Sequence, residues 1–437
     1  MLYRILKLLI GIGVRLYYRQ IKVKNAQFLA HQGPIIIIAN HPNTLMDAWI
    51  IGQVCSQPIH FLAKGTFFNS PFKRWILNSL NMIPINRQVD GNTDGVSNNL
   101  SFEACYKVLE AGKTLVIFPE GNSVMERQLR ALKTGTARIA LEVQKRNKGN
   151  LNLLIVPVGI FYSQAEKFRS SVFVNFGKGE LVKETIDENG GISIASKRLT
   201  ARLRLLLEQV LVSTESKEQE KLIEDVSDIL RPYRPVKGIE GKAELMKSIK
   251  VEMEEIQLTQ PYLLDEIQQI CNSIKWKKTQ LKIKSDFIKN RFKSKVYLAK
   301  LAISIVYVII LLPVFLFGIV HSFLPFKLTE YLMPKLIKNI EYYAPIAVLI
   351  GLIVYPLNYF LLFQLTNYVF DLNLIVKIIY LLAMPITGMF AYYFVRFLHS
   401  FSFRWKYFFV VINQNEAMQN LEKQRNRLSE ILFENNK

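Results

Sequence analysis

The amino-acid sequence predicts an α/β layered domain with a mixed sheet, followed by a charged helical linker and a C-terminal transmembrane helical region. Short β-rich runs alternate with helical stretches between residues 33 and 176, which is typical of a sheet with helices on both faces. Residues 201–296 are charged helix formers without a strand pattern, and long apolar runs follow them. The chain therefore divides into five predicted segments: 1–25, 26–200, 201–296, 297–412 and 413–437.

The first 25 residues predict a membrane-interface anchor. They contain six Lys or Arg side chains and no Asp or Glu, interleaved with leucine, isoleucine, valine and tyrosine. A basic, apolar helix of this kind lies at the surface of a bilayer. Because Arg15 interrupts the apolar run and no small-residue cleavage site follows, a retained helix is favoured over a secretory signal.

Residues 26–200 contain the predicted α/β domain. Its predicted strands are residues 35–39, 59–62, 83–86, 114–118, 153–158 and 171–176. Its predicted helices begin near residue 43 and at residues 71–80, 100–109 and 133–144. In such folds, ligands bind on loops at the carboxyl ends of the strands. Three polar residues fall at such ends and are site candidates: His41, Arg87 and Glu120.

A histidine and a carboxylate follow the first strand in the stretch Asn-His-Pro-Asn-Thr-Leu-Met-Asp at residues 40–47. Neutral imidazole can take the proton of an alcohol as the hydroxyl attacks a carbonyl carbon, so His41 is a candidate general base. Asp47 would hold the other ring nitrogen and stabilise the imidazolium that forms. Taken alone, the stretch also fits a polar turn that caps a helix.

Three further blocks follow in the α/β region. They are Met-Ile-Pro-Ile-Asn-Arg ending at Arg87, Phe-Pro-Glu-Gly at residues 118–121 and Val-Pro-Val-Gly at residues 156–159. Together with the histidine block, in this order, they resemble the phospholipid/glycerol acyltransferase superfamily over roughly residues 25–200. The resemblance implies that His41 and Asp47 are the catalytic pair.

The spacing of this pair points to one branch of the superfamily. Five residues separate His41 from Asp47, whereas the commonest form of the superfamily has four. Five-residue spacing occurs in the branch that acylates glycerol 3-phosphate or dihydroxyacetone phosphate. The resemblance therefore favours the first acylation step of phospholipid biosynthesis.

The resemblance also implies a site for the substrate phosphate. Arg87 matches an arginine that binds this phosphate, and a forked guanidinium can donate two parallel hydrogen bonds to it. Lys64 matches another basic position of the family and would add a point charge. The alternative for Lys64 is a solvated surface cation.

The Phe-Pro-Glu-Gly block adds further binding candidates. Glu120 would accept hydrogen bonds from a glycerol hydroxyl or from the arginine, and Gly121 would allow close approach of the backbone. Asn122 stands where the family usually has threonine, and the arginine that usually follows is absent. Lys133 resembles a further family position and would restore positive charge. Residues 156–159 match a block linked to the acyl donor, or form a core strand.

The C-terminal region predicts two to three membrane spans. Apolar runs near the ~20 residues needed to cross a bilayer occupy residues 301–320, 342–370 and 378–395. A basic cluster at residues 275–300 precedes them, which places this side in the cytosol by the positive-inside rule. Three cations follow the third run: Arg396, Arg404 and Lys406. Two crossings with a re-entrant or interfacial segment are therefore an alternative. Residues 413–437 predict a polar helical tail.

Other functional classes are disfavoured. The net charge is +21, but the basic residues crowd against apolar segments, so we expect a membrane and no nucleic acid as partner. Cys55, Cys105 and Cys271 are widely spaced, and we expect neither a disulfide framework nor a metal site. The sequence has no P-loop or dinucleotide fingerprint, and we expect no cofactor.

The sequence thus predicts a membrane-bound O-acyltransferase that moves a fatty acyl group from acyl-coenzyme A or acyl carrier protein to glycerol 3-phosphate or dihydroxyacetone phosphate. The alternative acceptor is 1-acylglycerol 3-phosphate, and the non-enzyme alternative is an inert lipid-binding scaffold in the membrane. The expected partners are these substrates and anionic membrane lipid. We expect an integral membrane protein with a cytosolic catalytic domain, in the cytoplasmic membrane if the protein is bacterial.

Overall fold

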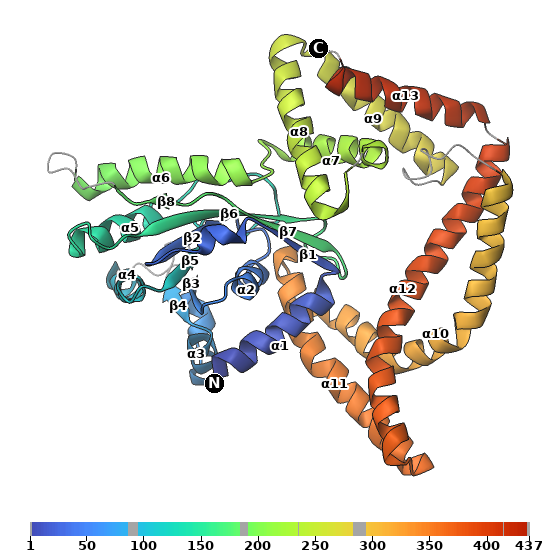
Figure 1. Ribbon diagram of the computed structural model, residues 1–437, viewed down its shortest axis with the longest axis horizontal. Helices are drawn as coiled ribbons and strands as arrows, with labels where there is room; N and C mark the ends of the chain where they lie inside the picture. Colours follow the sequence, from blue (N-terminus) through green and yellow to red (C-terminus); the bar gives the residue numbers. More distant parts are fainter. Residues whose placement is uncertain are drawn as a thin grey trace. The chain divides into compact units, whose positions relative to one another are not determined.

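The computed structural model describes residues 2–85, 95–183, 191–234, 236–282, 294–413 and 415–434 (Figure 1). The chain forms two compact units. The first consists of Met1–Lys217 and Ile337–Leu349, and the second of Glu218–Leu336 and Ile350–Lys437. The first unit thus contains the predicted α/β domain together with a segment from the apolar C-terminal region.

An eight-stranded mixed sheet forms the centre of the first unit. Its strands are β1 (Gln20–Lys24), β2 (Ile35–Ala39), β3 (Ile59–Lys64), β4 (Met82–Ile85), β5 (Thr114–Ile117), β6 (Leu154–Tyr162), β7 (Ser171–Phe176) and β8 (Glu180–Leu181). Their order is β1-β7-β6-β2-β5-β3-β4, and β8 also pairs with β6. β6 runs antiparallel to β7 and β8, whereas the other pairs are parallel. The predicted mixed sheet is confirmed.

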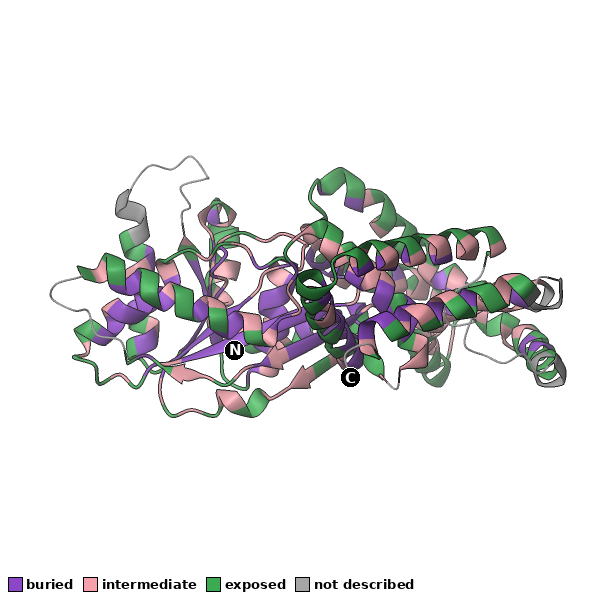
Figure 2. Ribbon diagram, turned by 90° about the horizontal axis from the view of Figure 1, so that it is seen from above, coloured by how far each residue is buried: buried purple, intermediate pink, exposed green. Residues whose placement is uncertain are grey.

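The middle of the sheet is its most buried part. β2 lies between β5 and β6, and all its residues are buried, as expected for an isoleucine run covered on both faces. Helices α4 (Gly95–Glu110), α5 (Gly135–Arg146) and α6 (Gly191–Val210) bury their apolar side chains against one face. α1 (Leu2–Tyr17) and α2 (Leu45–Val54) pack together on the other face (Figure 1). Figure 2 shows the strands largely buried between these layers.

The first 25 residues are only partly helical. α1 ends at Tyr17, and β1 pairs in parallel with β7 from Gln20 onward. The basic and apolar composition of this stretch predicts one interfacial helix, but residues 20–24, Gln-Ile-Lys-Val-Lys, alternate with the period of a strand. The basic residues in β1 therefore belong to the edge of the sheet, where charged side chains are common.

The second unit is built from helices. They are α7 (Lys217–Leu230), α8 (Gly238–Thr259), α9 (Tyr262–Leu281), α10 (Ser294–Leu336), α11 (Tyr343–Phe370), α12 (Leu374–Asn413) and α13 (Asn415–Phe433). α13 packs on α9 and buries Leu421 and Leu428, while Arg427 Nε donates to Glu266 Oε1 at 2.7 Å. The leucines of the tail thus form one helical stripe that is packed within the unit.

Three helices in the described part of the chain are long and apolar enough to cross a membrane. They cover Leu298–Leu336, Ile340–Phe370 and Leu374–Tyr407. Most of their apolar side chains are exposed, as in helices that face lipid. α10 has 43 residues, which corresponds to about 65 Å of helix and exceeds the hydrocarbon thickness of a bilayer. The apolar region is therefore compatible with membrane insertion.

Candidate active site

His41 and Asp47 meet at the carboxyl end of β2. The strand ends at Ala39 and α2 begins at Leu45, so His41 lies in the turn between them and Asp47 in the first turn of α2. His41 Nδ1 lies 3.0 Å from Asp47 Oδ2, and the Asp47 side chain is fully buried. Because a carboxylate only accepts hydrogen bonds, this pairing places the proton of neutral imidazole on Nδ1. Nε2 is then the nitrogen that can take a proton.

Two further donors hold the Asp47 carboxylate. The Tyr162 hydroxyl donates to Oδ1 at 2.6 Å, and the backbone N–H of Asn43 donates to Oδ2 at 2.7 Å. A buried carboxylate is stable only when such donors replace its hydration. Burial, together with the Asp47 charge, raises the pKa of Tyr162 well above its ordinary value, so the phenol stays a donor at neutral pH. Sequence reasoning missed Tyr162, which ends β6 just beyond the Val-Pro-Val-Gly block.

The His41 ring is also fixed on its face. It stacks on the Phe118 ring with 3.9 Å between centroids and 11° between planes. Phe118 directly follows β5, which pairs with β2. Because the two strands are adjacent and parallel, the Phe-Pro-Glu-Gly block contacts the histidine. This agrees with the prediction that both lie at the carboxyl ends of strands.

Glu120 joins the histidine loop to an arginine that sequence reasoning missed. Its Oε1 accepts from the backbone N–H of His41 at 3.2 Å, and its Oε2 accepts from Arg130 Nε at 2.9 Å. Arg130 also donates to the side-chain and backbone oxygens of Asn122, at 2.6 and 2.5 Å. Arg130 thus supplies a guanidinium beside this block, where the sequence shows that the usual following arginine is absent. No pattern in the sequence links Arg130 to Glu120, because ten positions separate them outside any regular helix or strand.

Gly121 and Lys133 lie in contact. Gly121 has φ of +81°, and an added Cβ would stand 2.8 Å from the Lys133 Cδ and Cε atoms. The Lys133 backbone N–H donates to the Pro119 carbonyl at 2.8 Å. The backbone conformation therefore favours glycine, whereas a Cβ would only displace the flexible end of the Lys133 side chain. The Lys133 ammonium lies beside the Glu120 block as a second cation.

The other two predicted binding residues are Lys64 and Arg87. Lys64 ends β3, half-buried at the same edge of the sheet as Ala39 and Phe118. Arg87 lies outside the described residues, two positions after the end of β4. Among the residues that the structure describes, no three His, Cys, Asp or Glu side chains are grouped to hold a metal ion.

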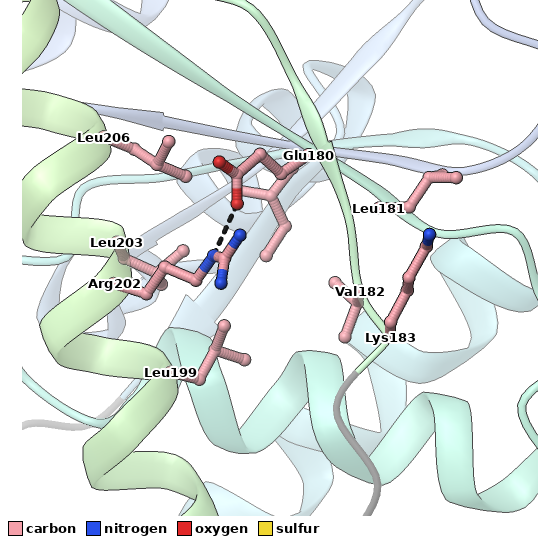
Figure 3. Close-up of a pocket in the computed structure, with 9 residues that line it drawn as sticks. Glu180, Leu181, Val182, Lys183, Leu199, Arg202, Leu203 and Leu206 are labelled. Carbon is pink, nitrogen blue, oxygen red and sulfur yellow. Dashed lines mark hydrogen bonds and ion pairs between the residues drawn. The ribbon is translucent and has the colours of Figure 1, made fainter.

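A separate pocket of about 210 Å³ lies between β8 and α6 (Figure 3). Leu199, Leu203 and Leu206 line it, together with the ion pair of Arg202 and Glu180. Its wall includes Ile155, seven residues before Tyr162 on β6, which is about 23 Å along a strand. The pocket is therefore distinct from the His41 site.

Comparisons with known proteins give a family match and a similar solved structure. Residues 20–161 match the sequence model of the Acyltransferase family, a range that includes every predicted site residue. The matched residues lie within the N-terminal α/β domain. The 1-acyl-sn-glycerophosphate (LPA) acyltransferase PlsC from Thermotoga maritima is a similar solved structure, with 18% identity and a TM-score of 0.34 over 47% of this chain and 78% of that one. A search of curated proteins finds no match.

Proposed function

We propose that this protein is a membrane-bound O-acyltransferase that transfers a fatty acyl group from a thioester to a hydroxyl of a glycerol phosphate. The observation that carries the proposal is the 3.0 Å contact between His41 Nδ1 and buried Asp47 Oδ2, within the segment that matches the Acyltransferase family. Pairing a carboxylate with imidazole is the arrangement that general-base catalysis requires.

The reaction follows from these positions. His41 Nε2 removes the proton of the acceptor hydroxyl as its oxygen attacks the thioester carbonyl carbon. Asp47 stabilises the imidazolium that results, and its three donors keep the carboxylate in place. The tetrahedral intermediate then expels the thiolate, which receives the proton from imidazolium. The products are an ester and a free thiol, and neutral His41 is restored.

An enzyme nucleophile is not needed, because the substrate supplies the attacking oxygen. The three cysteines also suit that role poorly. All are buried, and burial raises the pKa of the Cys55 thiol to about 11 and the pKa values of Cys105 and Cys271 to about 12. At neutral pH such thiols are almost entirely protonated and unreactive.

The acceptor phosphate would be bound by cations near Glu120. Lys133 and Arg130 lie beside this block. Lys64 ends the neighbouring strand β3, and Arg87 follows β4 by two positions in the sequence. We propose glycerol 3-phosphate as acceptor, with dihydroxyacetone phosphate as a possible substitute, because of the five residues between His41 and Asp47. The same arrangement suits 1-acylglycerol 3-phosphate, whose phosphate is equivalent and whose acyl chain a membrane can accommodate. The donor is acyl-coenzyme A or acyl carrier protein.

We further propose that the catalytic unit lies on the cytosolic leaflet. α1 packs one face against α2 and exposes Leu8 and Ile12 on the other. α3 (Pro71–Ser79) exposes the stacked rings of Phe72 and Trp75, with cations between them in sequence. Exposed aromatic and basic side chains together favour an anionic bilayer surface. The basic residues that precede α10 favour the cytosolic side.

The two surface elements lie near each other. The Tyr3 hydroxyl lies beside the backbone of Ile59, and Asn81 Nδ2, two residues after α3, donates to the Ile59 carbonyl at 3.4 Å. The start of α1 and the end of α3 therefore share a residue of β3. This proximity supports one lipid-facing surface made by both helices.

The test is an acyl-transfer assay of membranes that contain the protein, in which each of the three acceptors is offered with each donor. The proposal expects an acylated glycerol phosphate from at least one pair, and the preferred pair identifies the step. A chain that forms no product with any pair would instead be the inert lipid-binding scaffold.

A further inference from the structure

Thr44, which stands between His41 and Asp47, has a strained backbone. Its φ is 44° and its ψ is −126°, a conformation that is a genuine outlier for a β-branched residue. Such a conformation persists only where surrounding groups hold it. The groups that contact Thr44 therefore help to determine where the Asp47 carboxylate lies relative to the His41 ring.

Two hydrogen bonds from distant parts of the chain hold Thr44. Its backbone N–H donates to Ser123 Oγ at 3.0 Å, and its Oγ1 donates to the Glu341 carbonyl at 3.0 Å. Ser123 follows the Phe-Pro-Glu-Gly block of the same domain. Glu341, by contrast, lies in the short helix Ile340–Tyr342 that connects α10 to α11.

This connection is built into the acyltransferase unit. Residues 337–349 belong to the first unit, although α10 and most of α11 belong to the second. Four of its apolar side chains are buried: Ile337, Ala344, Pro345 and Val348. The connection is thus packed and hydrogen-bonded within the unit that contains His41, rather than exposed as a free loop between two apolar helices.

We propose that residues 337–349 are a structural part of the active site, in which the Glu341 carbonyl holds Thr44 and, through Thr44, the spacing of His41 and Asp47. Thr44 is a positioning residue, because it acts through the catalytic pair. This inference rests on the proposed function, since the geometry of Asp47 matters for turnover only if His41 is the base. The connection between the first two candidate membrane helices is then required for catalysis as well as for insertion.

The first test compares two variants of Thr44 in the full-length protein in membranes. Thr44→Val keeps the β-branched shape and removes the donor to Glu341, whereas Thr44→Ser keeps the donor. We expect Thr44→Val to lower kcat about fivefold, as for the loss of one ordinary hydrogen bond. The KM values for donor and acceptor should stay unchanged, and Thr44→Ser should retain most of the wild-type kcat.

The second test loosens the connection without changing the catalytic loop. A Gly-Ser-Gly-Ser insertion after Lys338 should lower kcat to a similar degree. The matched control is the same insertion after Asp371, in the α11–α12 connection, which belongs to the second unit; it should leave kcat unchanged. Thr44→Val and the insertion after Lys338 both disrupt the same hydrogen bond, from Thr44 to the Glu341 carbonyl. The combined variant should therefore have a kcat only slightly lower than that of either single variant.

The outcomes separate this inference from the proposed function. Wild-type membranes that transfer no acyl group contradict the proposed function. If the wild type is active, equal kcat values for Thr44→Val, the Lys338 insertion and the wild type would overturn the role of the connection while leaving His41 as the base. Equal losses from both insertions would also overturn it, because the effect would then not be specific to residues 337–349.

Discussion

The Tyr162 hydroxyl donates a 2.6 Å hydrogen bond to Oδ1 of Asp47, so the last residue of β6 holds the carboxylate that orients His41. The two residues are 115 positions apart in the chain. Their contact joins the Val-Pro-Val-Gly strand to the histidine loop, and it gives that strand a part in catalysis besides its place in the core.

Tyr162→Phe should therefore lower kcat about tenfold, or ~1.4 kcal/mol, because the Asp47 carboxylate loses a donor and orients His41 less well. The KM for the thioester should change little. Steady-state kinetics measure both. Tyr106→Phe is the control, since Tyr106 is a buried tyrosine of α4 whose ring packs beneath Arg146 of α5. An equal kcat for Tyr162→Phe and the wild type would remove Tyr162 from the site.

Arg130→Lys should raise the KM for the acceptor. Lysine keeps the charge, but its single nitrogen cannot reproduce the geometry in which separate guanidinium nitrogens donate to Glu120 and Asn122. We expect an increase on the order of tenfold for the acceptor and no comparable change for the thioester.

Arg146→Lys is the matched control for this change. Arg146 also pairs with a carboxylate, Glu103, but on the exposed surface of α4 and α5, where ion pairs contribute little. If Arg130→Lys weakened only thioester use, the Glu120 block would belong to the donor side of the site.

Alkylation of thiols should leave turnover intact. Burial raises the pKa values of the three cysteines to about 11 or 12, and the proposed reaction passes through no thioester on the enzyme. Folded protein in membranes treated with iodoacetamide at neutral pH should retain its activity. Inactivation that substrate prevents would indicate a cysteine nucleophile and would oppose the direct transfer.

The surface formed by α1 and α3 should insert into the bilayer. A nitroxide attached at Phe72→Cys should collide with dissolved oxygen more than with a water-soluble nickel complex. Leu100→Cys on α4 is the control, since Leu100 is equally exposed but belongs to another helix. The native cysteines are buried and should label slowly. A nitroxide at position 72 that reports water would place α3 away from lipid.

The contact between His41 and Asp47 could be predicted from their position after a buried isoleucine strand. His41 lies in the loop that follows this strand, and Asp47 lies in the first turn of the next helix. The mixed sheet followed from the alternation of strands and helices. Arg130 and Thr44 could not be predicted in the same way. The contact of Arg130 with Glu120 depends on how residues 121–129 turn, and Thr44 meets Glu341 across 297 residues. Neither local propensity nor spacing determines such contacts.

β1 illustrates a different limit. Residues 20–24 alternate between polar and apolar side chains, but they are assigned to the predicted anchor because they follow an apolar helix. Their strand conformation depends on pairing with residues 171–175, which are far away in the sequence. Short strands gain most of their stability from such tertiary partners. The alternating pattern of a strand was present in the sequence, but whether these residues form a strand depends on the position of β7.

The most direct measurement is the rate of acyl transfer by His41→Ala in membranes, relative to the wild type and to His31→Ala. His31 is a partly exposed histidine whose Nε2 lies 2.8 Å from the Asn152 carbonyl, and it serves as the control. The account predicts at least the ~10²-fold loss typical of a missing general base for His41→Ala, unchanged thermal unfolding, and a normal rate for His31→Ala. A His41→Ala protein that transfers acyl groups at the wild-type rate would contradict it.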